Sequence, residues 1–294
     1  MKIALTGASG FIGRNIVKRL LQDKHHLTLL THRAQTANSD NRQIKTVSGG
    51  IDDIQALKKA FEGADIIIHL VGIIVETRKN SFEKTVIEGT KNVVAAAKQV
   101  GNPKIIYISA LGTSANATTK YHQSKYEAEQ AIINSGLEYI IFRPSLVYGE
   151  GDGFVSMLSG QIKQLPFTPV IGHGRYLFQP IYIDDLAEAV NASLTKENCI
   201  GKIIDLAGDE RLEYLQILTH IKQALGKKRM NFHIPLPVMK IIARLLEMFL
   251  KPAPVTVDQM TMLEMGNVGD NRFMKKELNI EPVKFFEGLE KYLR

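Results

Sequence analysis

The sequence predicts an α/β protein, a doubly wound parallel sheet followed by a smaller, mainly helical carboxyl-terminal lobe. Short apolar runs alternate with longer amphipathic stretches through the first half of the chain. A glycine-rich turn follows the first apolar run, and the alternation breaks down after Arg143. Continuous apolar runs separated by helices are typical of parallel strands that are covered on both faces.

Six apolar, β-branched segments have the pattern of buried strands. They are residues 2–6, 27–31, 44–48, 64–72, 104–109 and 138–143. Between them lie amphipathic patterns, such as residues 54–63 and 89–101, which close on a glycine as helices commonly do. Because strand–helix–strand connections are right-handed, these units predict one sheet with helices on both faces.

The second half of the chain has a different organisation. Loop-like stretches rich in proline and glycine follow Arg143, and residues 181–190 and 202–208 then predict a strand, a helix and one more sheet strand. The remainder is mainly helical. We therefore expect one domain over residues 1–144, with 178–208 returning to it, and a smaller lobe for substrate or partner binding from residues 145–177 and 209–294.

The composition limits the number of domains and the cellular compartment that we expect. The 294 residues are 45% hydrophobic and 23% charged, which suits one large or two modest domains. The one cysteine, Cys199, excludes a disulfide framework and fits a reducing compartment. No secretory segment opens the chain, and no window holds the roughly 18 apolar residues that a membrane span needs. We therefore expect a cytoplasmic protein.

The net charge is +7, but its lysines and arginines are scattered and form no long basic run. This distribution argues against nucleic acid as a partner and favours a ligand that carries phosphate. No His, Cys and Asp cluster has the spacing of a metal site, so no metal is expected. His69 ends an apolar run and is interpreted as a core residue or a residue at the edge of a ligand.

The segment TGASGFIG directly follows the first predicted strand. There Gly7 permits a tight turn, Gly10 lets the backbone approach a pyrophosphate, and Gly13 lets helix and strand pack closely. The free N–H groups at the helix start would hold the phosphates. The alternative interpretation is that the three glycines only allow close packing and bind no phosphate. The turn predicts a dinucleotide-binding Rossmann domain, and the contacts expected from it are Gly7, Ser9, Gly10, Phe11, Ile12 and Gly13.

The residues at the end of the second predicted strand indicate whether NAD or NADP is the preferred cofactor. It offers Thr31, His32 and Arg33 and no carboxylate for the adenosine ribose, whereas a cation favours the 2′-phosphate of NADP. A charge-assisted hydrogen bond from Arg33 would contribute about 1.5–3 kcal/mol, or roughly a ten- to hundredfold preference. A solvated loop cation is the alternative reading of Arg33. We expect NADP or NADPH to be favoured over NAD, with His32 and Arg33 in contact with it.

The order of the motifs resembles that of extended-type short-chain dehydrogenases/reductases over nearly the whole chain. The motifs are TGASGFIG, GADIIIHLVG, EGTKNVVAAAKQVG, IIYISALG, YHQSK, FRPSLVYGEGD and QPIYIDDLAEAV. Two stretches, VIGHGRYLFQPIYIDDLA and VTVDQMTMLEMGNV, are similar to an atypical, epimerase/dehydratase-like branch. That branch contains the nucleotide-binding accessory subunit of respiratory complex I and its bacterial relatives.

The resemblance implies that Tyr121 is a catalytic acid or base and that Lys125 assists it. Four residues apart on a helix, the two side chains share a face. A free phenol has a pKa of about 10, and a neighbouring ammonium and a nicotinamide cation would both favour the phenolate. Lys125 would also bind the nicotinamide ribose. A chance surface pair is the alternative, which the motif context disfavours.

The resemblance also implies cofactor contacts outside the glycine turn. The small turn at residues 71–72 approaches the cofactor, the segment from Pro144 lies beside the nicotinamide, and Ile51 contacts the adenine because Gly50 replaces an aspartate. These further contacts are Ile51, Leu70, Val71, Gly72, Ser109, Lys125, Pro144 and Val147.

One departure from the family pattern bears on catalysis. A Ser or Thr that orients the substrate carbonyl usually follows the fifth strand, but Ala110 and Leu111 stand there. Thr113 or Ser114 could replace it.

Three functions remain compatible with the residues. The first is an oxidoreductase, with NADP favoured, that acts on an unidentified small carbonyl or hydroxyl substrate. The second is a non-catalytic NADPH-binding sensor or assembly protein, and the third is a nucleotide-sugar epimerase or dehydratase. The apolar segment 238–251 has a basic fringe. It is interpreted as a helix packed on the second lobe, a peripheral membrane contact or a docking face for a protein complex.

Overall fold

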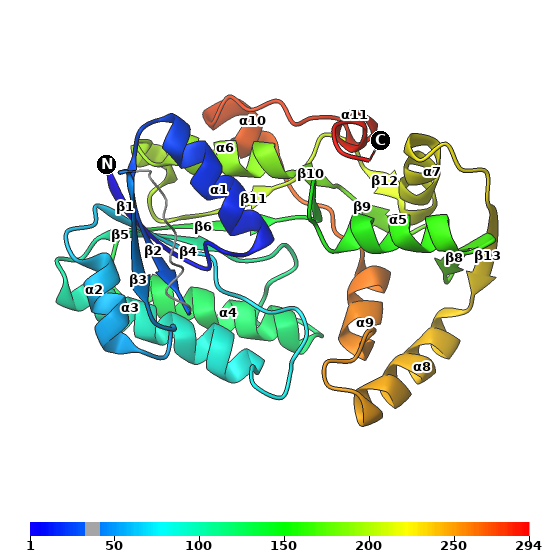
Figure 1. The fold of residues 1–294 in the computed structure, drawn as a ribbon, viewed down its shortest axis with the longest axis horizontal. Coiled ribbons are helices and arrows are strands. Elements are labelled where there is room, and N and C mark those ends of the chain that lie inside the picture. Colours follow the sequence, from blue (N-terminus) through cyan, green and yellow to red (C-terminus); the bar gives the residue numbers. More distant parts are fainter. Residues whose placement is uncertain (33–41, 294) are drawn as a thin grey trace. The chain divides into compact units, whose positions relative to one another are not determined.

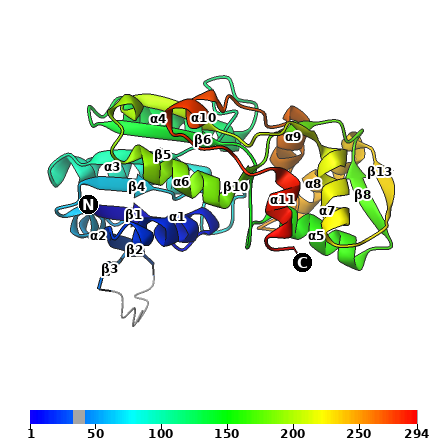
Figure 2. The ribbon, with the colours of Figure 1, turned by 90° about the horizontal axis from the view of Figure 1, so that it is seen from above.

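The computed structural model describes residues 1–32 and 42–293, whose course is shown in Figures 1 and 2. The chain divides into two compact units. The first comprises Met1–Arg143 and Ala187–Ile204, and the second comprises Pro144–Leu186 and Asp205–Arg294.

A seven-stranded sheet forms the centre of the first unit, in the order β11-β6-β5-β4-β1-β2-β3. The neighbouring pairs from β3 to β6 are all parallel. This is the doubly wound parallel sheet that the sequence predicts. Its strands are β1 (Lys2–Thr6), β2 (His26–Thr31), β3 (Ile44–Ser48), β4 (Ile66–His69), β5 (Lys104–Ile108), β6 (Tyr139–Pro144) and β11 (Lys202–Leu206).

One predicted strand is too long. The apolar run 64–72 forms only the four residues of β4, and Leu70 already lies outside the strand. The N–H group of Leu70 donates to the carbonyl of Thr6, after which the chain turns toward the glycines that follow β1. Apolar content alone does not distinguish a strand from the loop that continues it, so this end was mispredicted.

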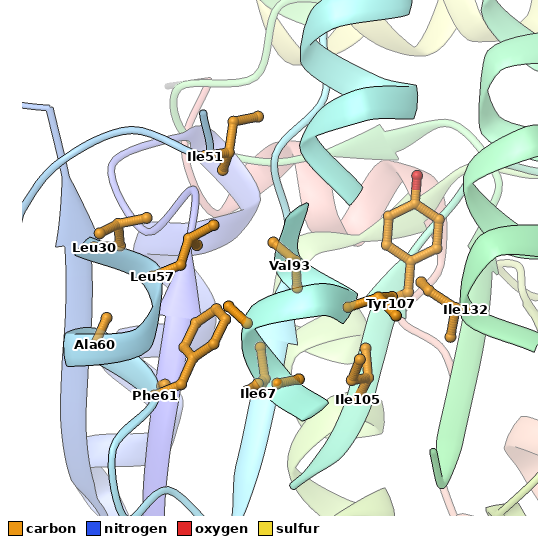
Figure 3. Close-up of a cluster of buried hydrophobic side chains, with 14 of the residues drawn as sticks. Leu30, Ile51, Leu57, Ala60, Phe61, Ile67, Val93, Ile105, Tyr107 and Ile132 are labelled. Atoms are coloured by element: carbon orange, nitrogen blue, oxygen red, sulfur yellow. The ribbon is translucent and has the colours of Figure 1, made fainter. Parts of the chain in front are cut away.

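Helices cover both faces of this sheet, as Figure 1 shows. On one face, α2, α3 and α4 pack on alternate strand residues such as Ile67 and Ile105, in the buried cluster drawn in Figure 3. On the other face, Arg19 of α1 pairs with Glu188 of α6. The helices are α1 (Phe11–Gln22), α2 (Ile54–Phe61), α3 (Gly89–Gln99, after the π-helical turn η1, Glu83–Glu88), α4 (Lys120–Ile133) and α6 (Ile183–Ser193), with the short 3-10 turn η2 (Glu197–Cys199).

Local sequence signals set the ends of two helices that matter for the site. The carboxylate of Asp53 accepts from the N–H of Ala56 and begins α2. The hydroxyl of Thr119 accepts from the N–H of His122 at 3.3 Å and begins α4. Side-chain oxygens at this position satisfy amides that have no partner inside the helix. The caps therefore fix the residues at which α2 and α4 begin.

The second unit contains short strands and helices. Its three two-stranded sheets pair β10 with β7, β12 with β9 and β13 with β8. The strands are β7 (Val147–Tyr148), β8 (Phe167–Ile171), β9 (Leu177–Phe178), β10 (Ile181–Tyr182), β12 (Leu212–Glu213) and β13 (Met230–Ile234). The helices are α5 (Phe154–Gln164), α7 (Tyr214–Ala224), α8 (Leu236–Phe249), α9 (Val257–Met265), α10 (Arg272–Glu277) and α11 (Phe285–Glu290).

Candidate functional site

The turn after β1 has no room for side chains at two of its glycines. Gly7 has a φ of +78°, and a Cβ on it would come within 3.0 Å of the backbone of Leu70 and Val71. A Cβ on Gly13 would come within 2.3 Å of the carbonyl oxygen of Gly7. The first turn of α1 is thus pressed against the end of β1, and the end of β1 against the loop after β4.

Gly10 differs from these two glycines because the space beside it is open. It is exposed, and a Cβ on it would meet only the carbonyl oxygen of Gly7, at 3.4 Å. Gly10 is the N-cap of α1, where no side chain accepts from the first amides, and the first turn carries no acidic residue. Free amides and the positive end of the helix dipole make such a helix start suitable for a phosphate. Ser9 is exposed beside it, and Phe11 and Ile12 are half-buried.

The strand order places this turn at a topological switch point. From β1 the chain continues to β2 and β3 on one side, and β4, β5 and β6 lie on the other. All of these strands end at the same edge of the sheet because they are parallel. In open α/β sheets, ligands bind in the crevice outside the strand ends at this point.

Lys125 of α4 reaches the same edge. Its Nζ donates to the carbonyl oxygen of Ile108, the last residue of β5, at 2.9 Å. It lies 3.0 Å from the position of a Cβ on Gly72, in the loop after β4, and 4.8 Å from the ring centre of Tyr107. Only 3% of the residue is exposed. Burial lowers the pKa of Lys125 to about 8, an effect that the nearby carboxylate of Glu129 partly opposes.

Tyr121 lies one turn before Lys125 and is half-buried. Its ring packs edge-on against His122 at 5.1 Å and is tilted against Phe82 at 6.2 Å. Burial raises the pKa of Tyr121 to about 12, so the phenol is protonated near neutral pH. The sequence predicts the opposite direction, on the argument that Lys125 and a nicotinamide cation favour the phenolate. That argument concerns the phenol beside a bound nicotinamide cation, whereas burial shifts the pKa of Tyr121 in the other direction.

A buried ion pair fixes the helix that carries both residues. Glu129, one turn after Lys125, accepts from Nε and Nη2 of Arg143 at 2.9 and 2.6 Å. The Glu129 side chain is fully buried, and Arg143 belongs to β6. A two-point guanidinium–carboxylate contact specifies orientation as well as distance. It therefore holds the face of α4 that bears Tyr121, Lys125 and Glu129 against the sheet.

The hydroxyl groups after β5 have distinct positions. Ser109 is buried, and its N–H donates to the carbonyl of Phe142 at 2.8 Å. Its Oγ lies 3.5 Å from the Oγ1 of Thr113, which is also buried, whereas Ser114 is exposed. Of the two substitutes that the sequence suggests for the missing hydroxyl, Thr113 is therefore the one that lies beside Ser109.

The structure describes only part of the predicted adenine side. Ile51 is buried, and a Cβ on Gly89 would come within 2.3 Å of its Cδ1, so its side chain packs toward α3 (Figure 3). His32 is exposed, and its ring lies 2.8 Å from a Cβ position on Gly50. Arg33 lies outside the described residues.

A buried histidine joins three elements under the crevice. The Oγ1 of Thr90 donates to the carbonyl of Val86 and so accepts from the Nε2 of His69, at 3.0 Å. The Nδ1 of His69 must then accept from the hydroxyl of Thr6, at 2.6 Å. Burial, and secondarily the charge of Lys125, lowers the pKa of His69 to about 3. Sequence reasoning did not identify Thr6 or Thr90, because a threonine at a strand end or inside a helix is common.

Pro144 and Val147 are the two predicted contacts that belong to the second unit. Pro144 ends β6, and Val147 begins β7, where it pairs with Ile181 of β10.

Within residues 1–32 and 42–293, no group of three His, Cys, Asp or Glu side chains could hold a metal ion. None of the described helices is long and apolar enough to cross a bilayer.

Residues 3–207 match the sequence model of the NAD dependent epimerase/dehydratase family. The chain is 26% identical to mitochondrial NADH dehydrogenase (ubiquinone) 1 alpha subcomplex subunit 9 of Arabidopsis thaliana, over 95% of this chain and 73% of the relative. The same subunit of Mus musculus is 24% identical, and the match covers 81% of this chain and 65% of that protein. Ceramide reductase of Caulobacter vibrioides is 26% identical, over 80% and 74% of the two chains.

Solved structures show the same fold at low identity. UDP-glucuronic acid 4-epimerase from Bacillus cereus, in complex with UDP-glucuronic acid and NAD, has a TM-score of 0.75 at 21% identity, over 99% of this chain and 97% of that one. A nucleoside-diphosphate-sugar epimerase from Staphylococcus aureus has a TM-score of 0.79 at 21% identity, over 99% and 100%.

Proposed function

The chain belongs to the NAD dependent epimerase/dehydratase family, and from this premise we propose that it is a short-chain-dehydrogenase-type oxidoreductase that favours NADP and acts on a small carbonyl or hydroxyl substrate. One observation carries the proposal. The open helix start at Gly10 follows β1, the buried ammonium of Lys125 binds the end of β5, and only β4 lies between these two strands at the same edge of one parallel sheet.

The residues present fit a dinucleotide. The open space beside Gly10 and the uncapped amides of α1 suit its diphosphate. Gly7 and Gly13 allow the close packing of this turn, because a Cβ on either would collide with backbone atoms. An ammonium has three N–H donors, so Lys125 can bond to Ile108 and still donate to ribose hydroxyls. The bound dinucleotide would supply or accept a hydride at its nicotinamide ring.

The protonation state of Tyr121 favours the reductive direction. Because burial holds its pKa near 12, Tyr121 carries the proton that a carbonyl oxygen needs when it becomes a hydroxyl. As a base for alcohol oxidation it would first have to lose that proton against the cost of burial. Thr113, or Ser109 beside it, would donate a hydrogen bond to the same oxygen in place of the hydroxyl that Ala110 lacks.

The preference for NADP rests on the residues that follow β2. Thr31 and His32 offer no carboxylate to an adenosine ribose, and Arg33 comes next in the sequence. The NAD in the Bacillus cereus epimerase structure supports the opposite preference for this fold. The sequence contains a single cysteine, Cys199, in keeping with the reducing cytoplasm that we propose as the compartment.

Two alternatives have support of their own. Ala110 at the expected hydroxyl position, with a subunit of NADH dehydrogenase among the relatives, favours a non-catalytic NADPH-binding assembly or sensor protein. The named epimerase structures favour a nucleotide-sugar epimerase or dehydratase, although Ala110 counts against it. Ceramide reductase among the relatives favours the enzyme.

Thermal denaturation with NAD, NADH, NADP and NADPH in turn tests the proposal. A ligand at a hundred times its dissociation constant adds about 2.7 kcal/mol to the free energy of unfolding. We expect NADPH and NADP to raise the melting temperature and NADH and NAD to raise it little. Equal shifts with NADH would contradict the NADP preference, and no shift with any of the four would contradict dinucleotide binding.

A further inference from the structure

Helix α8 exposes more than half of its apolar residues. Of its fourteen residues only Ala243 is buried, and the inner side of the helix is tied to α9 by an ion pair between Lys240 and Glu264, at 2.6 Å. The large apolar side chains on the outer side are 41–76% exposed. They are Val238, Ile241, Ile242, Leu245, Met248 and Phe249.

The spacing of these residues defines one continuous face, which we call the α8 face. Positions separated by three, four and seven residues lie on the same side of a helix. Helix α8 packs on the second unit through its inner side, in line with one of the sequence interpretations, but the second unit leaves the α8 face exposed. Contiguous apolar patches of this kind are rare on monomers and mark interaction sites.

The segment of the sequence that contains α8 is rich in cations. Residues 222–251 carry seven lysines and arginines and a single acidic residue, Glu247. Lys227, Lys228 and Arg229 precede β13, Arg244 is exposed on α8, and Lys251 follows directly after its last turn. On α8 and directly after it, Arg244 and Lys251 therefore outnumber Glu247, while Lys240 is paired with Glu264 of α9.

We propose that the α8 face binds the surface of a membrane that contains anionic phospholipid. The helix lies in the interface with its apolar side chains among the upper acyl segments, while Arg244 and Lys251 contact phosphate headgroups. An apolar face bordered by cations is the pattern of interfacial helices. Fourteen residues extend about 21 Å, short of the roughly 30 Å hydrocarbon core, so the helix cannot span it.

Charge also distinguishes lipid from a second copy of the chain. A symmetric dimer through the α8 face would bring two segments together that each carry seven cations and one acid. Such like-charge juxtaposition disfavours association, whereas an anionic bilayer attracts Arg244 on α8 and Lys251 directly after it. The proposal needs no bound dinucleotide and is independent of the proposed function.

Flotation of the full-length protein with vesicles tests the proposal. The vesicles are pure phosphatidylcholine or an equimolar mixture of phosphatidylcholine and phosphatidylglycerol. We expect flotation with the mixture and little with the neutral lipid. Raising the salt from about 0.1 M to about 1 M shortens the Debye length from about 10 to about 3 Å and should release protein.

Substitutions on the α8 face supply the specific test. Ile241→Gln and Phe249→Gln should each lower the partition coefficient by roughly tenfold or more, because each removes a side chain that inserts. Ile203→Gln on β11 is the matched control, since Ile203 is 41% exposed and lies outside the face. We expect it to float like the wild type.

A fluorescence measurement tests insertion of the α8 face without polar substitutions, which can cause misfolding. The chain has no tryptophan, so Phe249→Trp and Ile203→Trp each introduce a single reporter at an exposed apolar position. We expect brominated phospholipid to quench the reporter at position 249 and to leave the one at 203 unquenched.

Three results would overturn the proposal: no flotation with either vesicle, flotation unaffected by Ile241→Gln and Phe249→Gln, or equal quenching at both positions. A lipid-free dimer that Ile241→Gln dissociates would show instead that a second copy covers the face.

Discussion

The Nζ atom of Lys125 donates a hydrogen bond to the carbonyl oxygen of Ile108 at 2.9 Å. This contact joins α4 to the end of β5, and Glu129, one turn further along α4, is held to β6 by Arg143. The ammonium is therefore positioned by the fold itself. Burying a charge costs free energy unless the charge is paired. The buried ammonium of Lys125 therefore lowers the free energy of unfolding, at a position where it can donate hydrogen bonds to a bound dinucleotide.

The cost of burying Lys125 predicts a pH dependence. Its pKa falls from 10.5 in the unfolded chain to about 8 in the folded protein. Between these values the unfolded chain binds more protons, so stability rises with pH. Relative to Lys125→Met, the wild type should gain up to about 3 kcal/mol in free energy of unfolding across that window. Urea denaturation at several pH values measures it, and parallel curves for the two proteins would contradict the buried ammonium.

Tyr121→Phe separates catalysis from cofactor binding. Loss of the proton donor should lower carbonyl reduction by roughly 10²- to 10⁴-fold and leave NADPH affinity nearly unchanged. Turnover is followed by the absorbance of NADPH with a panel of carbonyl compounds. Tyr126→Phe, on the same helix, is the matched control and should retain activity. Full activity in Tyr121→Phe would refute the proposed acid, and an inactive wild type that still binds NADPH would favour the assembly or sensor function.

His69 predicts a loss of stability in acid. Burial between Thr6 and Thr90 lowers its pKa from 6.5 to about 3, so the unfolded chain binds more protons between these values. Stability is therefore lost as the pH falls through that window, by up to about 5 kcal/mol for this group. His69→Gln keeps a donor and an acceptor but does not titrate. Its urea midpoint should depend less on acid pH than that of the wild type; an equal dependence would assign the acid loss to other groups.

Local patterns in the sequence were sufficient to predict the sheet and the turn geometry around Gly7 and Gly13. They were insufficient where a property depends on distant packing. Thr6 and Thr90 lie 63 and 21 residues from His69, so the buried network leaves no local signal. The direction of the pKa shift of Tyr121 depends on its burial, to which contact with Phe82, 39 residues away, contributes. The apolar pattern of α8 is the same whether the helix faces a core or remains exposed.

The central claim is that uncapped main-chain amides beside Gly10 bind the diphosphate of a dinucleotide. Calorimetric titration of NADPH into wild type, Gly10→Ala and Gly160→Ala tests it most directly. The backbone of Gly10, φ −72° and ψ 171°, suits alanine, and a Cβ on Gly160 would touch nothing within 4 Å, so both variants should fold. The methyl group of Gly10→Ala would occupy the open space beside the helix start and keep the phosphate away from the amides. We therefore predict that Gly10→Ala weakens NADPH binding by about ten- to hundredfold through lost hydrogen bonds to phosphate, while Gly160→Ala binds NADPH like the wild type. Undiminished NADPH affinity in Gly10→Ala would contradict the account.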